Sequence, residues 1–180
     1  VQNQVQKHEA YDQVLEKAVD WLNTIKSEAI DILNETTFEK EGAEEKLTVV
    51  ENLLQHKPEG DSIFDTCKQL LHTVLAQTHT NGHPALLKGF EEPQKAWLEF
   101  MELCQDSLVK LKQLCSKWDE FETVIDDIDS WMKQAEAVVK NQGLKSTAQA
   151  KKAHLAELQK IALEIEQKQP ALNDLMEQGR

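Results

Sequence analysis

The side chains that could do chemistry in this sequence are few, and they do not converge on one site. His72, His79 and His83 are spaced by seven and four residues, so one end of a helical bundle could bring them together. A tetrahedral zinc site would also need cysteine or carboxylate ligands nearby, and no such set accompanies them. Catalysis would need a nucleophile beside a base in a concave pocket, and the sequence offers no such pair. We predict surface or turn histidines, no enzymatic activity, and neither a metal nor a cofactor.

The three cysteines have the character of small core residues. Cys67, Cys104 and Cys115 each fall within an apolar helical stripe, and an odd number cannot all pair with one another. No C-x-x-C motif or cysteine–histidine pair points to a metal or redox site. Buried free thiols are typical of proteins in a reducing compartment, so we expect a cytoplasmic protein.

A dense acidic run lies between Trp118 and Met132, where no lysine or arginine interrupts it. Its six carboxylates fall within 11 residues: Asp119, Glu120, Glu122, Asp126, Asp127 and Asp129. Apolar residues interleave with them, so on a helix the carboxylates share the outer face. Two interpretations stay open. The run is either a solvated helix face or a patch at which a basic protein partner docks with electrostatic steering.

The overall charge restricts the partners further. Of 180 residues, 32 are acidic and 20 are basic, which gives a formal net charge of −12. Nucleic acids and anionic lipids bind surfaces rich in lysine and arginine, so we expect neither nucleic acid nor direct membrane contact for this segment. No apolar run reaches the length of a membrane-spanning helix, and the first residues do not read as a signal peptide. We therefore expect the partners of this segment to be other proteins.

The elements that must carry these residues are helices, and one of them is very long. Six glycines, four prolines and few aromatic residues leave little material for a sheet. From Gln94 to Gln142 the chain runs 49 residues without glycine or proline, about 74 Å at helical rise. A compact globule of this size has a radius of gyration of only about 16 Å. We therefore predict an all-α fold in which this helix continues from one bundle into another.

An unbroken seven-residue apolar repeat runs through the long helix. Its members are Phe90, Trp97, Cys104, Leu111, Trp118, Ile125, Met132 and Val139. This spacing places them on one face, as in a coiled coil. A second apolar series shifts by one position between Cys115 and Phe121, as a straight helix requires when it changes bundles. The residues that we expect to anchor the cores are Trp21, Trp97, Trp118, Trp131, Leu111 and Ile125.

Turn signals divide the chain into helices. The expected ranges are about 4–34, 38–78, 84–117, 118–142 and 146–178, with the third and fourth joined as one helix. Pro58 and Gly60 predict a kink or a break near 56–61, with Asp61 able to cap the helix that resumes.

Local pairs of residues predict how these helices begin. Thr36 with Glu39, and Ser146 with Gln149, have the spacing of capping boxes. The dipeptide at 81–82, Asn-Gly, predicts a turn with positive φ before the long helix.

Trp21 and Trp131 lie in similar settings, Val-Asp-Trp-Leu and Asp-Ser-Trp-Met, 110 residues apart. Each is followed by a turn and a proline-containing helix. Together with Trp97 in Lys-Ala-Trp-Leu, the turn at 81–84 and the continuous helix, they give the chain a resemblance to the spectrin-repeat family. The resemblance implies elongated left-handed three-helix bundles, with a complete repeat over 1–117 and the first two helices of a second over 118–180.

Within that family the chain looks most like the repeats of a giant nesprin, with plakin and dystrophin repeats as alternatives. The resemblance implies a non-catalytic cytoskeletal linker segment, a monomeric rod that acts as a spacer and a protein-binding scaffold. A nesprin would connect the cytoplasmic face of the outer nuclear membrane to actin through segments outside this chain. Its partners would be cytoskeletal or actin-regulating proteins.

A second function stays open because the second bundle lacks a third helix. The apolar faces around Trp131, Leu158 and Ile165 would then be incompletely covered. The chain could be an adaptor in which this open bundle, or the junction between bundles, docks a partner helix or a basic protein surface.

Overall fold

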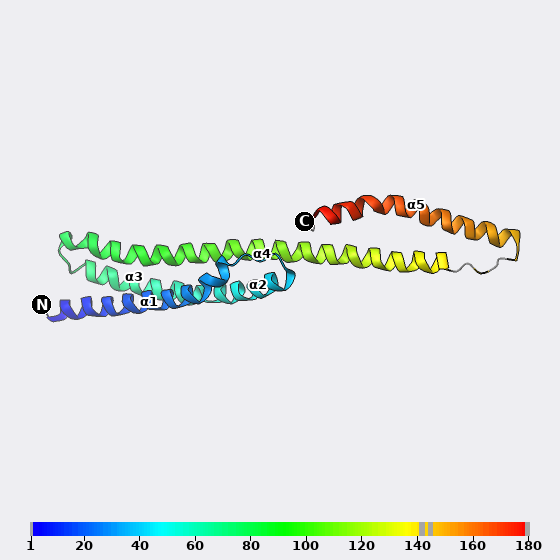
Figure 1. Ribbon diagram of the computed structural model, residues 1–180. Helices are drawn as coiled ribbons and strands as arrows, with labels where there is room; N and C mark the ends of the chain where they lie inside the picture. The colour runs from blue at the N-terminus through cyan, green and yellow to red at the C-terminus, as the bar shows by residue number, and fades with distance from the viewer. Residues whose placement is uncertain (1, 141–142, 144–145, 179–180) are drawn as a thin grey trace. The chain divides into compact units, whose positions relative to one another are not determined.

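The computed structural model describes residues 2–140, 143 and 146–178, and these residues form helices and connections without a strand (Figure 1). The predicted all-α class is therefore confirmed. The elements are α1 (Gln2–Asn34), α2 (Lys40–Gln55), α3 (Lys57–Leu75), the 3-10 helix η1 (Thr80–Gly82), α4 (His83–Lys140) and α5 (Ala148–Gln178). None of the described helices has both the length and the apolar character needed to cross a membrane.

The chain divides into two compact units, which we call unit 1 (Val1–Ser116) and unit 2 (Lys117–Arg180). Helix α4 contributes residues to both units. Because it has no interruption between His83 and Lys140, no loop separates the units.

Unit 1 is a bundle of α1, the α2–α3 pair and the first part of α4 (Figure 1). Its buried apolar side chains are Tyr11, Ala18, Leu22, Ile25 and Ala29 from α1, Ala43 and Val50 from α2, Phe64, Cys67, Leu71 and Val74 from α3, and Phe90, Trp97, Phe100, Met101 and Cys104 from α4. On each helix most of these residues follow one another at intervals of three, four or seven, which keeps them on one face. Burying these faces against one another removes apolar surface from water and stabilises the bundle.

The middle helix of unit 1 is interrupted at a single residue. His56 alone separates α2 from α3, and its N–H still donates to the Leu53 carbonyl (3.1 Å). Pro58 lies in the first turn of α3, where its missing N–H has no intrahelical partner to lose. The structure therefore has a break narrower than the expected 56–61 interval. Asp61, which we expected to cap the new helix, lies inside α3 instead.

The expected capping box at the start of α2 is wrong. The connection from α1 stays non-helical through Phe38, so α2 begins at Lys40, several residues after Thr36. Its N-cap residue is Glu39, which makes no side-chain cap hydrogen bond.

Two other expected turns also differ from the structure. At the start of α5 the Ala150 N–H donates to the hydroxyl of Thr147 (3.2 Å), which places the cap one residue after Ser146. Asn81 and Gly82 form the 3-10 turn η1 with negative φ, and no described residue has a positive φ. A 3-10 turn needs no left-handed residue, so the positive φ predicted from the Asn-Gly dipeptide is absent.

Unit 2 consists of the C-terminal part of α4 and α5. None of its described side chains is as buried as the core of unit 1. Two helices can cover each other on one side only, so each keeps a solvent-exposed face along its whole length.

Candidate protein-binding site

Trp97 lies in the core of unit 1, with 1% of its surface exposed. Its ring centroid is 5.2 Å from that of Trp21 and 6.3 Å from that of Phe64, distances typical of favourable aromatic pairs. Gly60 makes room for the ring, because a Cβ atom on this glycine would lie 2.2 Å from Trp97 Cζ2. The indole Nε1–H donates to Asp61 Oδ1 (3.0 Å), so the buried polar atom is satisfied.

Asp61 connects this core to the surface. One carboxylate oxygen accepts from Trp97, and the other accepts from Lys57 Nζ (2.7 Å) one turn earlier on α3. The hydrogen bond from Lys57 and then that from Trp97 hold the pKa of Asp61 below its usual value, because both favour the ionised form. Asp61 is thus an ionised acceptor that orients the indole.

Trp131 anchors unit 2 in a similar way with less cover. Its Nε1–H donates to Glu164 Oε2 on α5 (2.8 Å), and the ring stays half-buried. Lys168 Nζ lies 5.4 Å from the ring centroid, within the range of a cation–π interaction. The Trp131 hydrogen bond, together with the charge of Lys160, lowers the pKa of Glu164.

The other expected core anchors are less buried. Trp21 and Leu111 are half-buried and pack against the core of unit 1. In unit 2, Trp118 is half-buried and meets Phe121 edge to face, with ring centroids 5.6 Å apart. Ile125 is 45% exposed and therefore lies outside any core of the described chain. The reason is that a two-helix unit covers only one side of each apolar stripe.

The acidic residues singled out in the sequence all lie on α4 within unit 2. The exposed ones are Asp119, Glu120, Glu122, Asp126 and Asp127, while Asp129 is half-buried. Asp129 pairs with Lys133 one turn later (2.5 Å), and this contact raises the pKa of the Lys133 ammonium. By helical spacing, the carboxylates lie away from the half-buried Phe121 and Ile128. What this surface offers to a partner is negative charge.

The three histidines have separate surroundings. His72 is exposed on α3, and His79 Nδ1 accepts from the N–H of Asn81 (3.4 Å). His83 Nε2 donates to the carbonyl of Thr78 (2.9 Å), so it fastens the turn before α4. Among the described residues, no group of three or more histidine, cysteine or acidic side chains could hold a metal ion.

The cysteines are not joined by disulfides. Cys67 and Cys104 are buried, and burial raises the pKa of both thiols, that of Cys104 to about 11. A thiol with a raised pKa is a poor nucleophile at neutral pH. Cys115 is half-buried.

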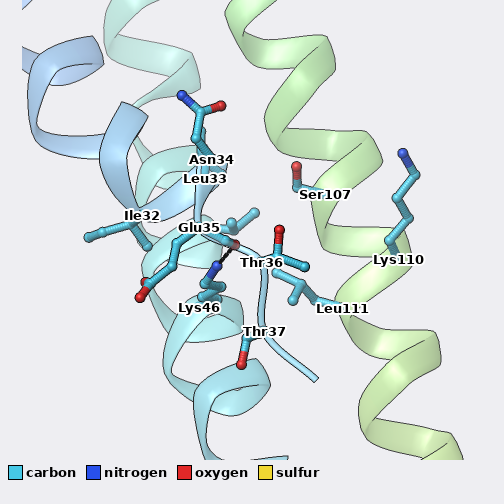
Figure 2. A pocket seen from close by; sticks show the side chains of 11 residues that line it. Ile32, Leu33, Asn34, Glu35, Thr36, Thr37, Lys46, Ser107, Lys110 and Leu111 are labelled. Carbon is cyan, nitrogen blue, oxygen red and sulfur yellow. Dashed lines mark hydrogen bonds between the residues drawn. The ribbon is translucent and has the colours of Figure 1, made fainter. Parts of the chain in front are cut away.

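The structure adds a cavity that the sequence patterns did not reveal. It has a volume of about 480 Å³ and lies in unit 1 beside the end of α1 (Figure 2). Lys46 lines it, although this lysine is only 8% exposed. A signal was present in the sequence, because Lys46 stands between Ala43 and Val50 at helical spacing, where an apolar residue is expected.

Comparison with known proteins was made for the whole chain. Residues 116–180 match the family model of the spectrin repeat. The chain is also 77% identical over 180 residues to the Muscle-specific protein 300 kDa of Drosophila melanogaster, a match that covers 100% of this chain and 2% of that protein. The chain therefore spans a small part of the length of this relative. No solved structure matches this chain.

The spectrin-repeat match includes all of unit 2 and draws attention to its exposed apolar residues. On α4 these are Ile125, Met132 and Val139, which are 43–46% exposed and spaced by seven. On α5, Leu155 and Ile165 are 55% and 50% exposed. We call the row on α4 the open face of unit 2, because its seven-residue spacing keeps the three residues on one side of the helix. A regular apolar row of this kind is the type of surface that another helix covers.

Proposed function

We propose that the chain is a non-catalytic linker segment made of successive spectrin repeats, a complete one over 1–117 and the first two helices of a second over 118–180. Support for the second repeat comes from the family match at 116–180. Support for the first comes from the bundle of unit 1, which packs heptad-spaced residues from all of its helices around Trp97.

The observation that carries the linker role is the continuity of α4. Its 58 residues correspond to about 87 Å at helical rise, and they enter both units without a loop. A helix shared by two bundles would hold their spacing and pass tension from one to the next. In this role the chain is a monomeric spacer, and its exposed helix faces are available as a scaffold for protein partners.

Small-angle X-ray scattering combined with light scattering tests the spacer role. We expect a monomer with a radius of gyration of about 27 Å, the value for a rod of the length of α4. A value of about 16 Å, that of a compact globule, would contradict the proposal. Lys117→Pro, placed where the units meet in the sequence, should broaden the distribution of dimensions because proline interrupts a helix. Lys117→Ala is the matched control and should leave the scattering unchanged.

For the parent protein we propose a giant nesprin-like linker between the cytoplasmic face of the outer nuclear membrane and the actin cytoskeleton. The support is the resemblance carried by Trp21, Trp97 and Trp131, together with the small share of a long, muscle-named relative that the chain covers. Staining cells with an antibody against this segment should give a perinuclear ring that disappears after knockdown of the parent transcript. Staining that never reaches the nucleus would remove the nesprin assignment but leave the linker role intact.

A second candidate function is that of an adaptor, which the open face of unit 2 favours. In this role the face, or the acidic residues on the same helix, would bind a helix or a basic surface from another protein. Extending the chain by the next 40 or so residues of its parent separates the two functions. If hydrogen exchange of the backbone amides around Met132 slows after the extension, the added residues of the parent cover the open face of unit 2. Unchanged exchange would favour the adaptor, and Asp126→Lys with Asp127→Lys would then show whether its partner needs the acidic residues.

A further inference from the structure

The cavity beside the end of α1 has walls from three helices and one loop (Figure 2). The loop contributes Thr36, α2 contributes Lys46, and α4 contributes Ser107 and Leu111. The cavity has a volume of about 480 Å³ and is open to solvent. All of these residues belong to unit 1, so the cavity is complete within one unit.

Lys46 gives the cavity its chemistry. The side chain is 8% exposed, and its Nζ donates to the backbone carbonyl of Glu35, just past the end of α1. An ammonium has three N–H donors, so this bond leaves two of them unused. Within the described residues Lys46 makes no ion pair. A buried positive charge that meets only a neutral carbonyl is therefore incompletely paired.

A purely structural role explains part of this arrangement. A cation near the last carbonyls of a helix stabilises its C-terminus, and Lys46 does this for α1. That role accounts for the bond to Glu35 but needs no cavity beside the ammonium. The space next to Lys46 is what the capping role leaves unexplained.

The other walls indicate what fits there. The hydroxyls of Thr36 and Ser107 lie beside the cavity, and Leu111 gives it an apolar wall (Figure 2). The carboxylate of Glu35 points away from Ser107 and Lys110 in the same view. The net charge of the chain has less effect on a charged group in the cavity than these neighbours have, because charges more than about 10 Å away are largely screened at physiological salt.

We propose that this cavity binds the carboxylate of an acidic side chain, glutamate or aspartate, on a protein partner. The carboxylate would take the two free donors of Lys46, with the hydroxyls of Thr36 and Ser107 completing its hydrogen bonds and Leu111 contacting its methylene groups. Two lysines line the cavity, and Lys46 is the buried one while Lys110 is exposed. The described residues contain no arginine, the residue best suited to a doubly charged phosphate. The site is separate from the open face of unit 2, and the proposal does not depend on the linker function.

The first test is an NMR titration of the 180-residue chain with two blocked amino acids that differ by charge alone. N-acetylglutamate amide should shift the backbone amides of Thr36 and Ser107 saturably, with a dissociation constant of about 1 mM or weaker for so small a probe. N-acetylglutamine amide, the neutral control, should not. Equal shifts from the two probes would overturn the proposal. Shifts from N-acetylleucine, whose carboxylate is a chain terminus, without shifts from the glutamate probe would overturn the assignment to an acidic side chain.

Two variants locate the binding. Lys46→Met keeps the length of the side chain but removes the charge, and it should weaken binding of the glutamate probe at least about tenfold. Ser107→Leu fills the cavity without touching the charge, and it should weaken binding while helicity stays unchanged. Lys95→Met, which changes an exposed lysine elsewhere on α4, is the control and should bind like the parent chain. If Lys46→Met proves unfolded, Ser107→Leu decides, and full binding by that variant would overturn the proposal.

Discussion

Both units hold a tryptophan by a hydrogen bond from its indole nitrogen to a carboxylate on another helix, yet only unit 1 buries the ring. Trp97 donates to Asp61 and is 1% exposed. Trp131 donates to Glu164 at a similar distance, 2.8 Å, and stays half-buried. The polar contact is therefore the same in the two units, and the difference lies in the apolar packing around the ring.

The seven-residue repeat of α4 shows where that difference comes from. Its first three members are buried, namely Phe90, Trp97 and Cys104. Its last three are 43–46% exposed, namely Ile125, Met132 and Val139. One helix thus presents one continuous apolar row that is a core in unit 1 and a surface in unit 2. A heptad pattern specifies a face, whereas burial depends on how many helices meet that face.

The largest expected effect comes from removing each tryptophan in turn. Trp97→Ala should lower the free energy of unfolding of unit 1 by about 3–5 kcal/mol, because it leaves a cavity that the packed bundle cannot close. Trp131→Ala should cost about 1–2 kcal/mol, because a half-buried ring leaves a space that solvent can enter. Urea unfolding followed by circular dichroism measures both. Leu98→Ala, at an exposed position of α4, is the control. Equal costs for the two tryptophans would break the comparison.

A smaller effect is expected from closing the space that admits Trp97. Gly60→Ala places a Cβ atom 2.2 Å from Trp97 Cζ2, so the ring or the helix must move. We expect a loss of about 1–3 kcal/mol, although alanine is otherwise the better helix former. The measurement is again the free energy of unfolding in urea.

Gly89→Ala is the matched control for this variant. Gly89 also lies inside a helix, and a Cβ atom there would meet nothing within 4 Å. The substitution should stabilise the chain by about 0.5–1 kcal/mol, the normal gain of replacing a helical glycine. If the two variants change stability in the same direction, the fit of Trp97 against Gly60 does not set the packing of unit 1.

These contrasts also show what the sequence could predict. Composition and periodicity together predicted an all-α chain and a helix running past residue 117, because the scarcity of glycine and proline and a seven-residue apolar spacing are local properties of the sequence. Burial along the row from Phe90 to Val139 could not be predicted in the same way. It depends on how many helices surround each turn, which is a property of the assembled bundle.

The errors at the helix ends and the missed cavity have a related cause. The start of α5 differs from expectation by one residue because Thr147 caps the helix in place of its neighbour Ser146, whereas α2 begins at Lys40 without a side-chain cap. Lys46 occupies an apolar position of its helix, and the pattern gave no reason for it. The reason lies 11 residues earlier, at the carbonyl of Glu35 to which it donates. Contacts between helices decide such details.

A modest effect, dependent on pH, is expected from the acceptor of Trp97. Asp61→Asn keeps an oxygen that can accept from the indole but removes the charge that Lys57 and Trp97 stabilise. The folded-state pKa of Asp61 lies below its ordinary value of 3.8, so its contribution is present above that value and is lost as pH falls through the folded-state pKa. The parent chain should therefore be more stable than the variant near neutral pH, and the gap should close in acid. Thermal melts between pH 2 and pH 7 measure it, and a gap that widens in acid would contradict the assignment.

The smallest expected effect comes from removing a buried polar atom that has no hydrogen-bond partner in the core of unit 1. The hydroxyl of Tyr11 is the only buried side-chain oxygen or nitrogen in the described chain without a hydrogen-bond partner. Tyr11→Phe should be neutral or stabilise unit 1 by up to about 1 kcal/mol, because it removes a polar group that gains nothing from burial.

Alkaline titration supplies a second readout for Tyr11→Phe. Desolvation raises the pKa of Tyr11 from 10.0 to about 12, so folding favours the protonated form, and stability should fall as pH rises from about 10 towards 12. This decline should be missing from the phenylalanine variant. Tyr11 is the sole tyrosine of the chain, so its tyrosinate absorbance reports one group. A titration midpoint near 10 in the folded chain would mean that the core of unit 1 admits water at this position.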